Sequence, residues 1–393
     1  MRNAEASGAA RAPVTRARQP YRLMVVDDSA VIRGLLTRSL EADPEVEVLA
    51  SASNGEMAVN ALARYDIEIV ILDIEMPVMD GLTALPKLLA AKPGVKVIIA
   101  STLTRRGADI SMRALAAGAD DYLTKPVASE LTSADEFKRD LLAKVKAIGF
   151  ARRRAHGLGA PEPGVPQTRA PLPAQADSVY ETPPDPRRRV VSLRPLSREF
   201  PEVVAIGSST GGPQALFKVL GQLKGALRQP IFITQHMPAT FTTILAEHIA
   251  RSSGYPTAEG VDGEPVRGGR IYVAPGDFHM VVEAKDRGEK VVRLTKAPPE
   301  NFCRPSVDPM LRSLAQIYGA RVLTLILTGM GHDGLNGGRA VVNAGGTVVA
   351  QDEATSVVWG MPGAVATAGL CSAVLALDEI APSIAKLAAR AAR

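Results

Sequence analysis

The stretch LMVVDDS, residues 23–29, places two adjacent aspartates directly after a run of apolar residues. Four more apolar runs follow, at residues 46–49, 67–72, 95–100 and 121–123. Amphipathic segments separate these runs at residues 31–40, 56–65, 82–91 and 110–117, and a last helix is expected over 134–148. Five strands that alternate with five helices predict a (βα)5 domain over residues 21–148, with a parallel sheet covered by helices on both faces.

The composition of the chain changes after residue 150. Eight prolines lie between residues 161 and 186, and Arg-rich triplets flank them at 152–154 and 187–189. Such a segment buries little surface, so residues 149–200 are predicted to form an extended linker, although its arginines could also contact an acidic partner. Residues 1–20, rich in Ala, Arg and Pro, are predicted to be a disordered tail.

Strand and helix signals resume in the C-terminal half of the chain. Apolar runs at residues 203–206, 231–234, 271–274, 322–327 and 347–350 alternate with strand-to-helix turns and helical segments. We therefore expect residues 201–393 to form a second α/β domain, doubly wound and with a mainly parallel sheet.

Charge and composition exclude several classes of protein. The formal net charge is +5, but residues 1–20 hold four Arg and one Glu, and residues 151–200 hold nine Arg and five acidic residues. The other residues are therefore slightly acidic, and aromatic residues make up only 4% of the chain, which argues against nucleic acid as a partner. Neither a run of about 18 apolar residues nor a secretory signal is present, so we expect a cytoplasmic protein without membrane insertion. The two cysteines, Cys303 and Cys371, are too few for a disulfide framework or a Cys-rich zinc site.

Charged side chains gather at the predicted strand ends of the first domain. Asp27 and Asp28 follow the first strand, Asp73 follows the third, Ser101 ends the fourth and Lys125 follows the fifth. The carboxyl ends of parallel strands share one edge, where open α/β sheets bind ligands. Three carboxylates there would repel one another, and Mg²⁺, which prefers oxygen ligands, would relieve the repulsion. A single aspartate after a strand is most often a turn former or a helix cap, whereas five such residues in register favour a site in which an aspartate attacks a phosphoryl group.

Three motifs closely resemble the receiver domain of bacterial response regulators: VVDDS at 25–29, ILDIEMPVMDG at 71–81 and TKP at 124–126. The resemblance implies that Asp73 accepts a phosphoryl group from a histidine kinase. It implies a magnesium site formed by Asp28, Asp73 and the backbone carbonyl of Glu75, with Asp27 beside them or acting through water. Ser101 and Tyr122 occupy the positions of the family's switching residues, and Lys125 occupies the position of its lysine.

The second domain begins with a glycine-rich turn, GSSTG at residues 207–211, between a predicted strand and a predicted helix. The G-x-S-x-G spacing allows a tight turn with Ser209 at its tip, and the helix N-terminus could stabilise an oxyanion. The same turn would also suit a nucleotide phosphate or have only a structural role. The turn by itself therefore leaves a serine nucleophile and a phosphate-binding loop as alternatives.

A serine nucleophile needs a base, and the chain holds five histidines. His236 and Asp333 each follow a predicted strand of the second domain, so both can project to the edge that carries Ser209. Such convergence is what a Ser-His-Asp triad requires, and the order Ser, His, Asp along the chain disfavours the α/β-hydrolase fold. His332 competes for the role of the base, but neighbouring side chains usually diverge, so we expect it in an exposed loop.

Six motifs resemble the catalytic domain of the chemotaxis protein-glutamate methylesterases, the CheB family of response regulators. They are AIGSSTGG (205–212), TQHMP (234–238), APGD (274–277), RPSVD (304–308), LTGMGHDG (327–334) and WGMPG (359–363). The resemblance implies hydrolysis of glutamate methyl esters on methyl-accepting chemotaxis receptors to glutamate and methanol, and in many relatives deamidation of receptor glutamines. It also implies a histidine kinase of the chemotaxis type as phosphodonor, and no cofactor for the esterase reaction.

The resemblance assigns a role to each residue of the second site. Ser209 would attack the ester carbonyl, His236 would take its proton and later activate water, and Asp333 would orient the imidazole. Backbone N–H groups near Met330 and at the Ser209 turn are the expected oxyanion donors. Thr210 either lines the pocket or caps the helix that follows.

Two positions depart from the family's pattern. Many relatives have a histidine before the RPSVD segment, where this chain has Cys303, and many have an asparagine before the triad aspartate, where it has His332. Cys303 could itself be a nucleophile, but we expect a buried bystander thiol.

We expect the first domain to cover the esterase site until Asp73 is phosphorylated, with the long linker allowing the domains to part. Three other functions would use the same first domain: a DNA-binding regulator, a catalytically silent scaffold, and an esterase of another signalling system or of a small ester. The acidic α/β second domain disfavours the first, and its three triad residue types disfavour the second.

Overall fold

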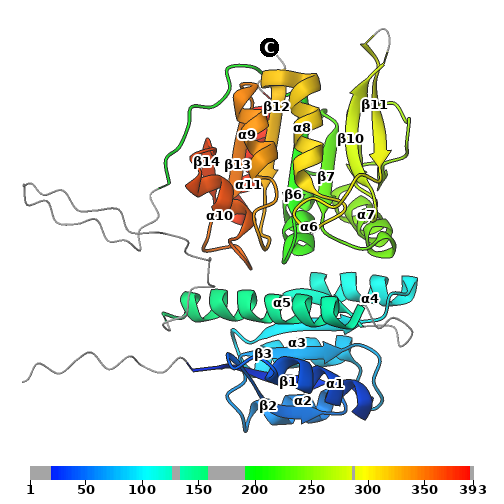
Figure 1. The fold of residues 1–393 in the computed structure, drawn as a ribbon, viewed down its shortest axis with the longest axis vertical. Helices are drawn as coiled ribbons and strands as arrows, with labels where there is room; N and C mark the ends of the chain where they lie inside the picture. Colours follow the sequence, from blue (N-terminus) through cyan, green and yellow to red (C-terminus); the bar gives the residue numbers. More distant parts are fainter. Residues whose placement is uncertain (1–18, 126–132, 158–190, 286–287, 390–393) are drawn as a thin grey trace, which may run out of the picture.

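The structure, a computed structural model, describes residues 19–125, 133–157, 191–285 and 288–389. These residues form two α/β domains that lie against each other (Figure 1). The predicted tail, apart from its last two residues, lies outside the described residues, as do residues 158–190 of the predicted linker.

The first domain contains a five-stranded sheet in the order β2-β1-β3-β4-β5, and every neighbouring pair is parallel. Its strands are β1 (Tyr21–Val26), β2 (Val46–Ala52), β3 (Ile69–Asp73), β4 (Lys96–Ser101) and β5 (Asp121–Thr124). The predicted (βα)5 architecture is therefore confirmed. Because the strand order reverses between β1 and β3, the loops that follow these two strands form a crevice at the carboxyl edge of the sheet.

The helices of this domain are α1 (Ala30–Glu41), α2 (Gly55–Leu62), α3 (Gly81–Ala91), α4 (Arg105–Ala116) and α5 (Ser133–Ala155). Local side chains fix where the first four begin, because each N-cap side chain accepts a hydrogen bond from a backbone N–H of the first turn. These N-caps are Ser29, Asn54, Asp80 and Thr104.

The fifth helix is longer than predicted, since it continues past residue 148 to Ala155. Two of its last residues, Arg152 and Arg153, are buried and both form an ion pair with the buried carboxylate of Glu68, at 3.1 and 2.6 Å. Arg153 also donates to the carbonyls of Gln19 and Pro20 at the entrance to β1. The expectation that the basic residues after 150 belong to a flexible segment is thus wrong for these arginines, because a buried acidic partner far away in the sequence orders them.

The second domain contains a seven-stranded, entirely parallel sheet in the order β14-β13-β12-β6-β7-β9-β8. Its strands are β6 (Val203–Ser208), β7 (Ile231–Gln235), β8 (Thr257–Glu259), β9 (Ile271–Val273), β12 (Val322–Ile326), β13 (Thr347–Gln351) and β14 (Ala373–Leu375). An antiparallel hairpin, β10 (His279–Ala284) and β11 (Lys290–Thr295), stands apart from this sheet. The doubly wound fold is as predicted, and the order of the strands reverses between β6 and β12.

The helices of the second domain are α6 (Gly212–Leu223), α7 (Ala239–Ser253), α8 (Val307–Tyr318), α9 (Leu335–Asn343), α10 (Met361–Thr367) and α11 (Leu377–Ala389). Alternate residues of β6 point to opposite faces of the sheet. Val204 and Ile206 pack in one apolar cluster with side chains of α6, α7 and α11. Val203 and Ala205 pack in another with side chains of α8, α9 and α10. Three helices therefore cover each face.

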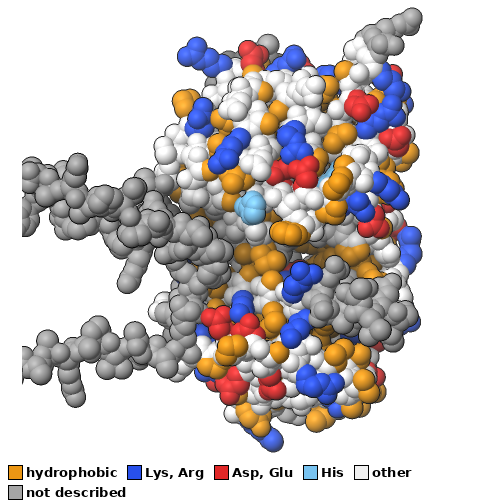
Figure 2. All heavy atoms as spheres, in the orientation of Figure 1, with side chains coloured by type: hydrophobic (Ala, Val, Ile, Leu, Met, Phe, Trp, Pro, Cys, Tyr) orange, Lys and Arg blue, Asp and Glu red, His pale blue; other side chains and the backbone are white. Residues whose placement is uncertain are grey.

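Helices α4 and α5 of the first domain face the second domain (Figure 1), and Tyr122 of β5 also contacts it. Helix α4 packs against α6 and α7, and the Tyr122 ring stacks on Phe241 with ring centroids 4.5 Å apart. Ion pairs surround this apolar contact, joining Arg105 to Glu247 at 2.5 Å and Arg154 to Glu353. Figure 2 shows hydrophobic side chains along the junction on the face that it draws.

The buried carboxylate of Glu68 should dominate the stability of the α5 attachment. We expect Glu68→Ala to lower the free energy of unfolding by about 3–5 kcal/mol, because it leaves two buried guanidinium groups without their partner. Asp66→Ala is the matched control: Asp66 binds Arg22 and Lys92, but its side chain is 62% exposed, so its loss should cost at most about 1 kcal/mol. Urea unfolding of the full-length chain measures both, and equal effects would contradict this role of Glu68.

Candidate functional site

Ser209 lies in the turn between β6 and α6, at the point where the strand order reverses. Its N–H donates to the carbonyl of Thr328 at 3.1 Å, and its carbonyl accepts from the N–H of Gly212 at 2.7 Å. Gly211 has a φ of +73°, and a Cβ at this position would lie 2.5 Å from the Val357 side chain. The turn therefore requires glycine at 211, and it presents Ser209 at the carboxyl edge of the sheet.

His236 follows β7 directly and lies on the same edge, as predicted. Its backbone N–H donates to the carbonyl of Ser208 at 3.3 Å, which ties the ends of β6 and β7 together. Its Nε2 lies 2.7 Å from Oδ2 of Asp333, so the predicted histidine and aspartate form a hydrogen-bonded pair. Both side chains are largely buried, with 12% and 1% of their surfaces exposed.

Asp333 is held by the N-terminus of helix α8 as well as by His236. The backbone N–H groups of Val307 and Asp308 donate to its carboxylate at 2.6 and 3.1 Å, and the N–H of Gly334 donates at 2.9 Å. Burial raises the pKa of this carboxyl, but the hydrogen bonds from His236 and Val307 outweigh burial, and the pKa of Asp333 is lowered. The carboxylate is therefore ionised and well placed to stabilise a charged imidazole.

Sequence reasoning missed Asn301, which also contacts this carboxylate. Its Nδ2 donates to Oδ1 of Asp333 at 2.8 Å and to Oδ2 of Asp308 at 3.0 Å. Both carboxylates are 1% exposed, so the amide separates two buried like charges. The only signal in the sequence is that Asn301 lies close to the RPSVD motif at residues 304–308.

Cys303 is not the buried bystander that we expected. It is partly exposed, and its Sγ lies 3.4 Å from Nδ1 of His236. Burial lowers the pKa of the imidazole, but hydrogen bonds with Asp333 and Cys303 outweigh burial and raise the pKa of His236 to about 10. The thiol thus contacts Nδ1, the imidazole nitrogen that does not bond to Asp333.

The Ser209 hydroxyl is not joined to His236 in this arrangement. Among the residues that the structure describes, no hydrogen bond from the Ser209 hydroxyl is found, to His236 or to any other group. His332 is exposed in the loop before Asp333, as expected. The chain thus assembles the histidine–aspartate pair completely and leaves the serine nearby but unpaired.

The expected oxyanion donors divide into two groups. The N–H of Ser209 is already used by Thr328, whereas the backbone hydrogen bonds found in the described part of the chain include none from the N–H groups of Thr210 or Met330. Gly329 lets the Met330 loop approach the nucleophile, because a Cβ there would lie 2.9 Å from Cβ of Ser209. The side chain of Thr210 is buried, and its carbonyl accepts from Oγ1 of Thr328 at 2.9 Å.

The predicted carboxylate cluster of the first domain is present at the β1/β3 crevice. Asp27, Asp28 and Asp73 each offer an oxygen within 4.8 Å of the others. Lys125 lies between two of them, with Nζ 2.6 Å from Asp27 Oδ2 and 2.6 Å from Asp73 Oδ1. Burial, together with the charge of Asp27, raises the pKa of Asp73 despite its contact with Lys125. Three hard oxygen donors that repel one another fit Mg²⁺ well.

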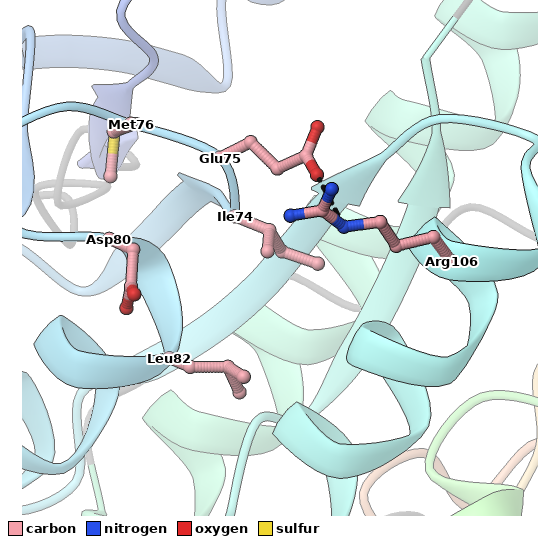
Figure 3. Close-up of a pocket in the computed structure, with 6 residues that line it drawn as sticks. All are labelled: Ile74, Glu75, Met76, Asp80, Leu82 and Arg106. Atoms are coloured by element: carbon pink, nitrogen blue, oxygen red, sulfur yellow. Dashed lines mark ion pairs between the residues drawn. The ribbon is translucent and has the colours of Figure 1, made fainter.

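Glu75 and Ser101 line the approach to this cluster. A cavity of about 180 Å³ opens onto Asp28, Asp73, Glu75, Ser101 and Lys125. Beside it, a cavity of about 340 Å³ is lined by Ile74, Glu75, Met76, Asp80, Leu82 and Arg106 (Figure 3). In that view the Glu75 side chain points toward Arg106 of α4, to which it is paired at 3.2 Å, so only its backbone is free for the role that the resemblance implies.

Tyr122 is buried at the junction of the two domains. Its ring is sandwiched between Phe241 of α7 and Nζ of Lys144, which lies 5.0 Å from the ring centroid. Burial, reinforced by the charge of Asp121, raises the pKa of Tyr122 well above its usual value, so the phenol stays neutral. The predicted switching aromatic thus forms part of the surface that meets the second domain.

Comparison with known proteins identifies both domains. The family model for the response regulator receiver domain matches residues 23–134, and that for CheB methylesterase matches residues 204–384. A protein-glutamate methylesterase/protein-glutamine glutaminase of Rhodospirillum centenum is 62% identical over 380 residues, covering 95% of each chain. Proteins of the same name from Paramagnetospirillum magneticum and Azospirillum brasilense are 61% and 62% identical, covering 94% and 95% of this chain and 96% and 94% of their own.

The chain belongs to the CheB methylesterase family. Like its relatives, this CheB protein combines a receiver domain with a hydrolase domain, and the receiver makes it a response regulator controlled by phosphorylation. Receiver domains are phosphorylated in the presence of Mg²⁺, which agrees with the oxygen donors at the β1/β3 crevice. Within the described part of the chain, no helix is long and apolar enough to cross a bilayer.

The carboxylate cluster should bind Mg²⁺ in the full-length protein. We expect Asp28→Asn to raise the dissociation constant for Mg²⁺ about tenfold or more, because one charged oxygen donor is lost. Glu75→Gln is the matched control, since the Glu75 side chain pairs with Arg106 and its backbone carbonyl is retained. Titration calorimetry with Mg²⁺ gives both constants, and equal affinities for Asp28→Asn and the native chain would refute the site.

Proposed function

We propose that this protein hydrolyses glutamate methyl esters on methyl-accepting chemotaxis receptors, releasing methanol, and that it deamidates receptor glutamines at the same site. The observation that carries this proposal is the buried 2.7 Å hydrogen bond between His236 and Asp333, on the sheet edge that also presents Ser209. The relatives' names describe the same two activities. An esterase of another signalling system or of a small ester, the third alternative named above, would use the same chemistry on a different substrate.

The reaction proceeds through an acyl-enzyme. Oγ of Ser209 attacks the ester carbonyl carbon while its proton passes to Nδ1 of His236, since Nε2 is committed to Asp333. The N–H groups of Thr210 and Met330 stabilise the oxyanion. The imidazolium gives its proton to the departing methanol, and water then attacks the acyl-enzyme with His236 as base, which releases glutamate. When an amide is the substrate, ammonia departs in place of methanol.

Phosphorylation of Asp73 controls access to this site. The proposed magnesium ligands are Asp28, Asp73 and the carbonyl of Glu75, with Asp27 beside them or acting through water, and bound Mg²⁺ would neutralise charge on the incoming phosphoryl group. Lys125, already beside Asp73, pairs with the phosphoryl oxygens, and Ser101 hydrogen-bonds them. A histidine kinase of the chemotaxis type supplies the phosphoryl group.

In the unphosphorylated protein the receiver covers the esterase edge. Val357 and Val358, which flank the Ser209 turn, pack against the receiver's own apolar cluster, and Tyr122 stacks on Phe241. A large protein substrate cannot reach Ser209 past these contacts. Movement of Ser101 and Tyr122 on phosphorylation would weaken them, and the chain between α5 and β6 keeps the separated domains together.

Triad substitutions test the chemistry. Ser209→Ala, His236→Ala and Asp333→Asn should each reduce kcat for methanol release from methylated receptor membranes by about 10⁴-fold. His332→Ala, which alters an exposed histidine next to Asp333, should keep the native rate. Native-like release by Ser209→Ala would refute the serine mechanism. Full activity toward a small ester with none toward receptors would assign the enzyme to another substrate.

A charge swap tests the covering role of the receiver. The ion pair between Arg105 and Glu247 joins the two domains, with 69% and 38% of the two side chains exposed. Glu247→Arg replaces this attraction by repulsion and should raise the rate without phosphodonor about two- to fivefold. The double variant Arg105→Glu/Glu247→Arg restores opposite charges and should return the basal rate to the native value. Rates with and without a small-molecule phosphodonor measure the effect. Identical basal rates in all three proteins would mean that this contact does not hold the receiver in place.

A further inference from the structure

A tight turn, Glu300 to Cys303, borders the esterase site. The N–H groups of Glu300 and Cys303 donate to each other's carbonyls at 3.1 and 2.9 Å, and the two residues between them, Asn301 and Phe302, have φ values of +53° and +62°. Two successive residues with positive φ are typical of a two-residue hairpin turn, in which the flanking side chains are held firmly. Glu300 is further anchored to helix α8 by Arg312, at 2.9 and 2.5 Å.

This turn contacts both members of the histidine–aspartate pair. Asn301 donates to Asp333, and Cys303 lies against Nδ1 of His236. The imidazole is therefore fixed on both sides, by Asp333 at Nε2 and by Cys303 at Nδ1. Asn301 also donates to Asp308 of α8, so the backbone of the turn that carries Cys303 is tied to this helix.

Nδ1 is the nitrogen that must receive the proton of Ser209, since Nε2 is committed to Asp333. It has room for one hydrogen-bond partner in the ring plane. In this structure that partner is Cys303, and, within the described residues, the Ser209 hydroxyl has no partner. Cys303 and Ser209 thus compete for a single position on the base.

We propose that Cys303 is a positioning residue that holds His236 in an idle state, and that Ser209 must displace it from Nδ1 before acyl transfer begins. This inference rests on the proposed function and adds a step to it. The contact restrains the basal rate while the receiver is docked.

The charges around His236 support the same conclusion. Its imidazole faces Asp333 from the β12–α9 loop and Cys303 from the turn, while Asp308 and Arg312 of α8 lie behind Asp333. Together the first two groups raise the pKa of His236 to about 10 against the effect of burial. A protonated imidazole cannot accept the proton of Ser209, so removing Cys303 should favour the neutral, active form of the base.

The test compares Cys303→Ala, Cys303→Ser and, as control, Cys371→Ala in the full-length chain without phosphodonor. Cys371 is the other free thiol, fully buried under β13 and α10 and outside the site. We expect Cys303→Ala to raise kcat about two- to tenfold at unchanged KM, the factor that corresponds to one ordinary hydrogen bond, and to move the acidic limb of the kcat–pH profile to lower pH. Cys303→Ser keeps a partner for Nδ1 and should stay near the native profile, as should Cys371→Ala.

The outcomes separate this inference from the proposed function. A kcat for Cys303→Ala that is unchanged or lower, with the acidic limb in its native place, would overturn the idle-state role. Equal profiles for the alanine and serine variants at position 303 would also overturn it, because the effect would then come from side-chain size. Full activity of Ser209→Ala would instead refute the serine mechanism itself, whatever the variants at 303 do. Unfolding midpoints of all variants verify that each one is folded.

Discussion

The buried carboxylate of Asp333 organises the esterase half of the molecule. An ionised group with 1% of its side chain exposed must find hydrogen-bond donors, and the first turn of a helix must find acceptors for its free N–H groups. The first N–H groups of helix α8 donate to the carboxylate of Asp333, and His236 and Asn301 donate to it as well. Four separate segments of chain are thereby fixed around one carboxylate, and the imidazole acquires a defined direction.

The carboxylates at the β1/β3 crevice of the receiver differ from Asp333, because they lie close to one another and repel. There Asp27 and Asp73 each accept one backbone N–H, and Lys125 bridges the two carboxylates without removing their mutual repulsion. Such a cluster is ready to accept a cation and a phosphoryl group, whereas Asp333 is fully satisfied. Strand β5 connects this cluster to the domain junction, because Lys125 directly follows the strand and Tyr122, within it, stacks on Phe241. One short strand therefore joins the phosphorylation pocket to the surface that meets the esterase.

Much of the architecture could be predicted from apolar periodicity and from polar residues at strand ends. The (βα)5 domain, the doubly wound second domain and the pairing of His236 with Asp333 all followed from these two signals. The edge strands β8 and β14 were missed; each has three residues, none of them fully buried, whereas β9 is equally short but fully buried and was predicted. The extension of α5 was missed because its stability comes from Glu68, which lies 84 residues before Arg152 and leaves no local signal.

The sequence alone placed Ser209, His236 and Asp333 at one edge of the second sheet, because the carboxyl ends of parallel strands must share an edge whatever the details of packing. Only the tertiary structure decided which atoms meet on that edge. It joined Nε2 of His236 to Asp333 and set Cys303, rather than Ser209, against Nδ1. The physical reason is that the orientation of the imidazole ring depends on interatomic distances that differ by only a few tenths of an ångström between one arrangement and another. These distances join segments remote in sequence, and strand periodicity and motif spacing do not encode them.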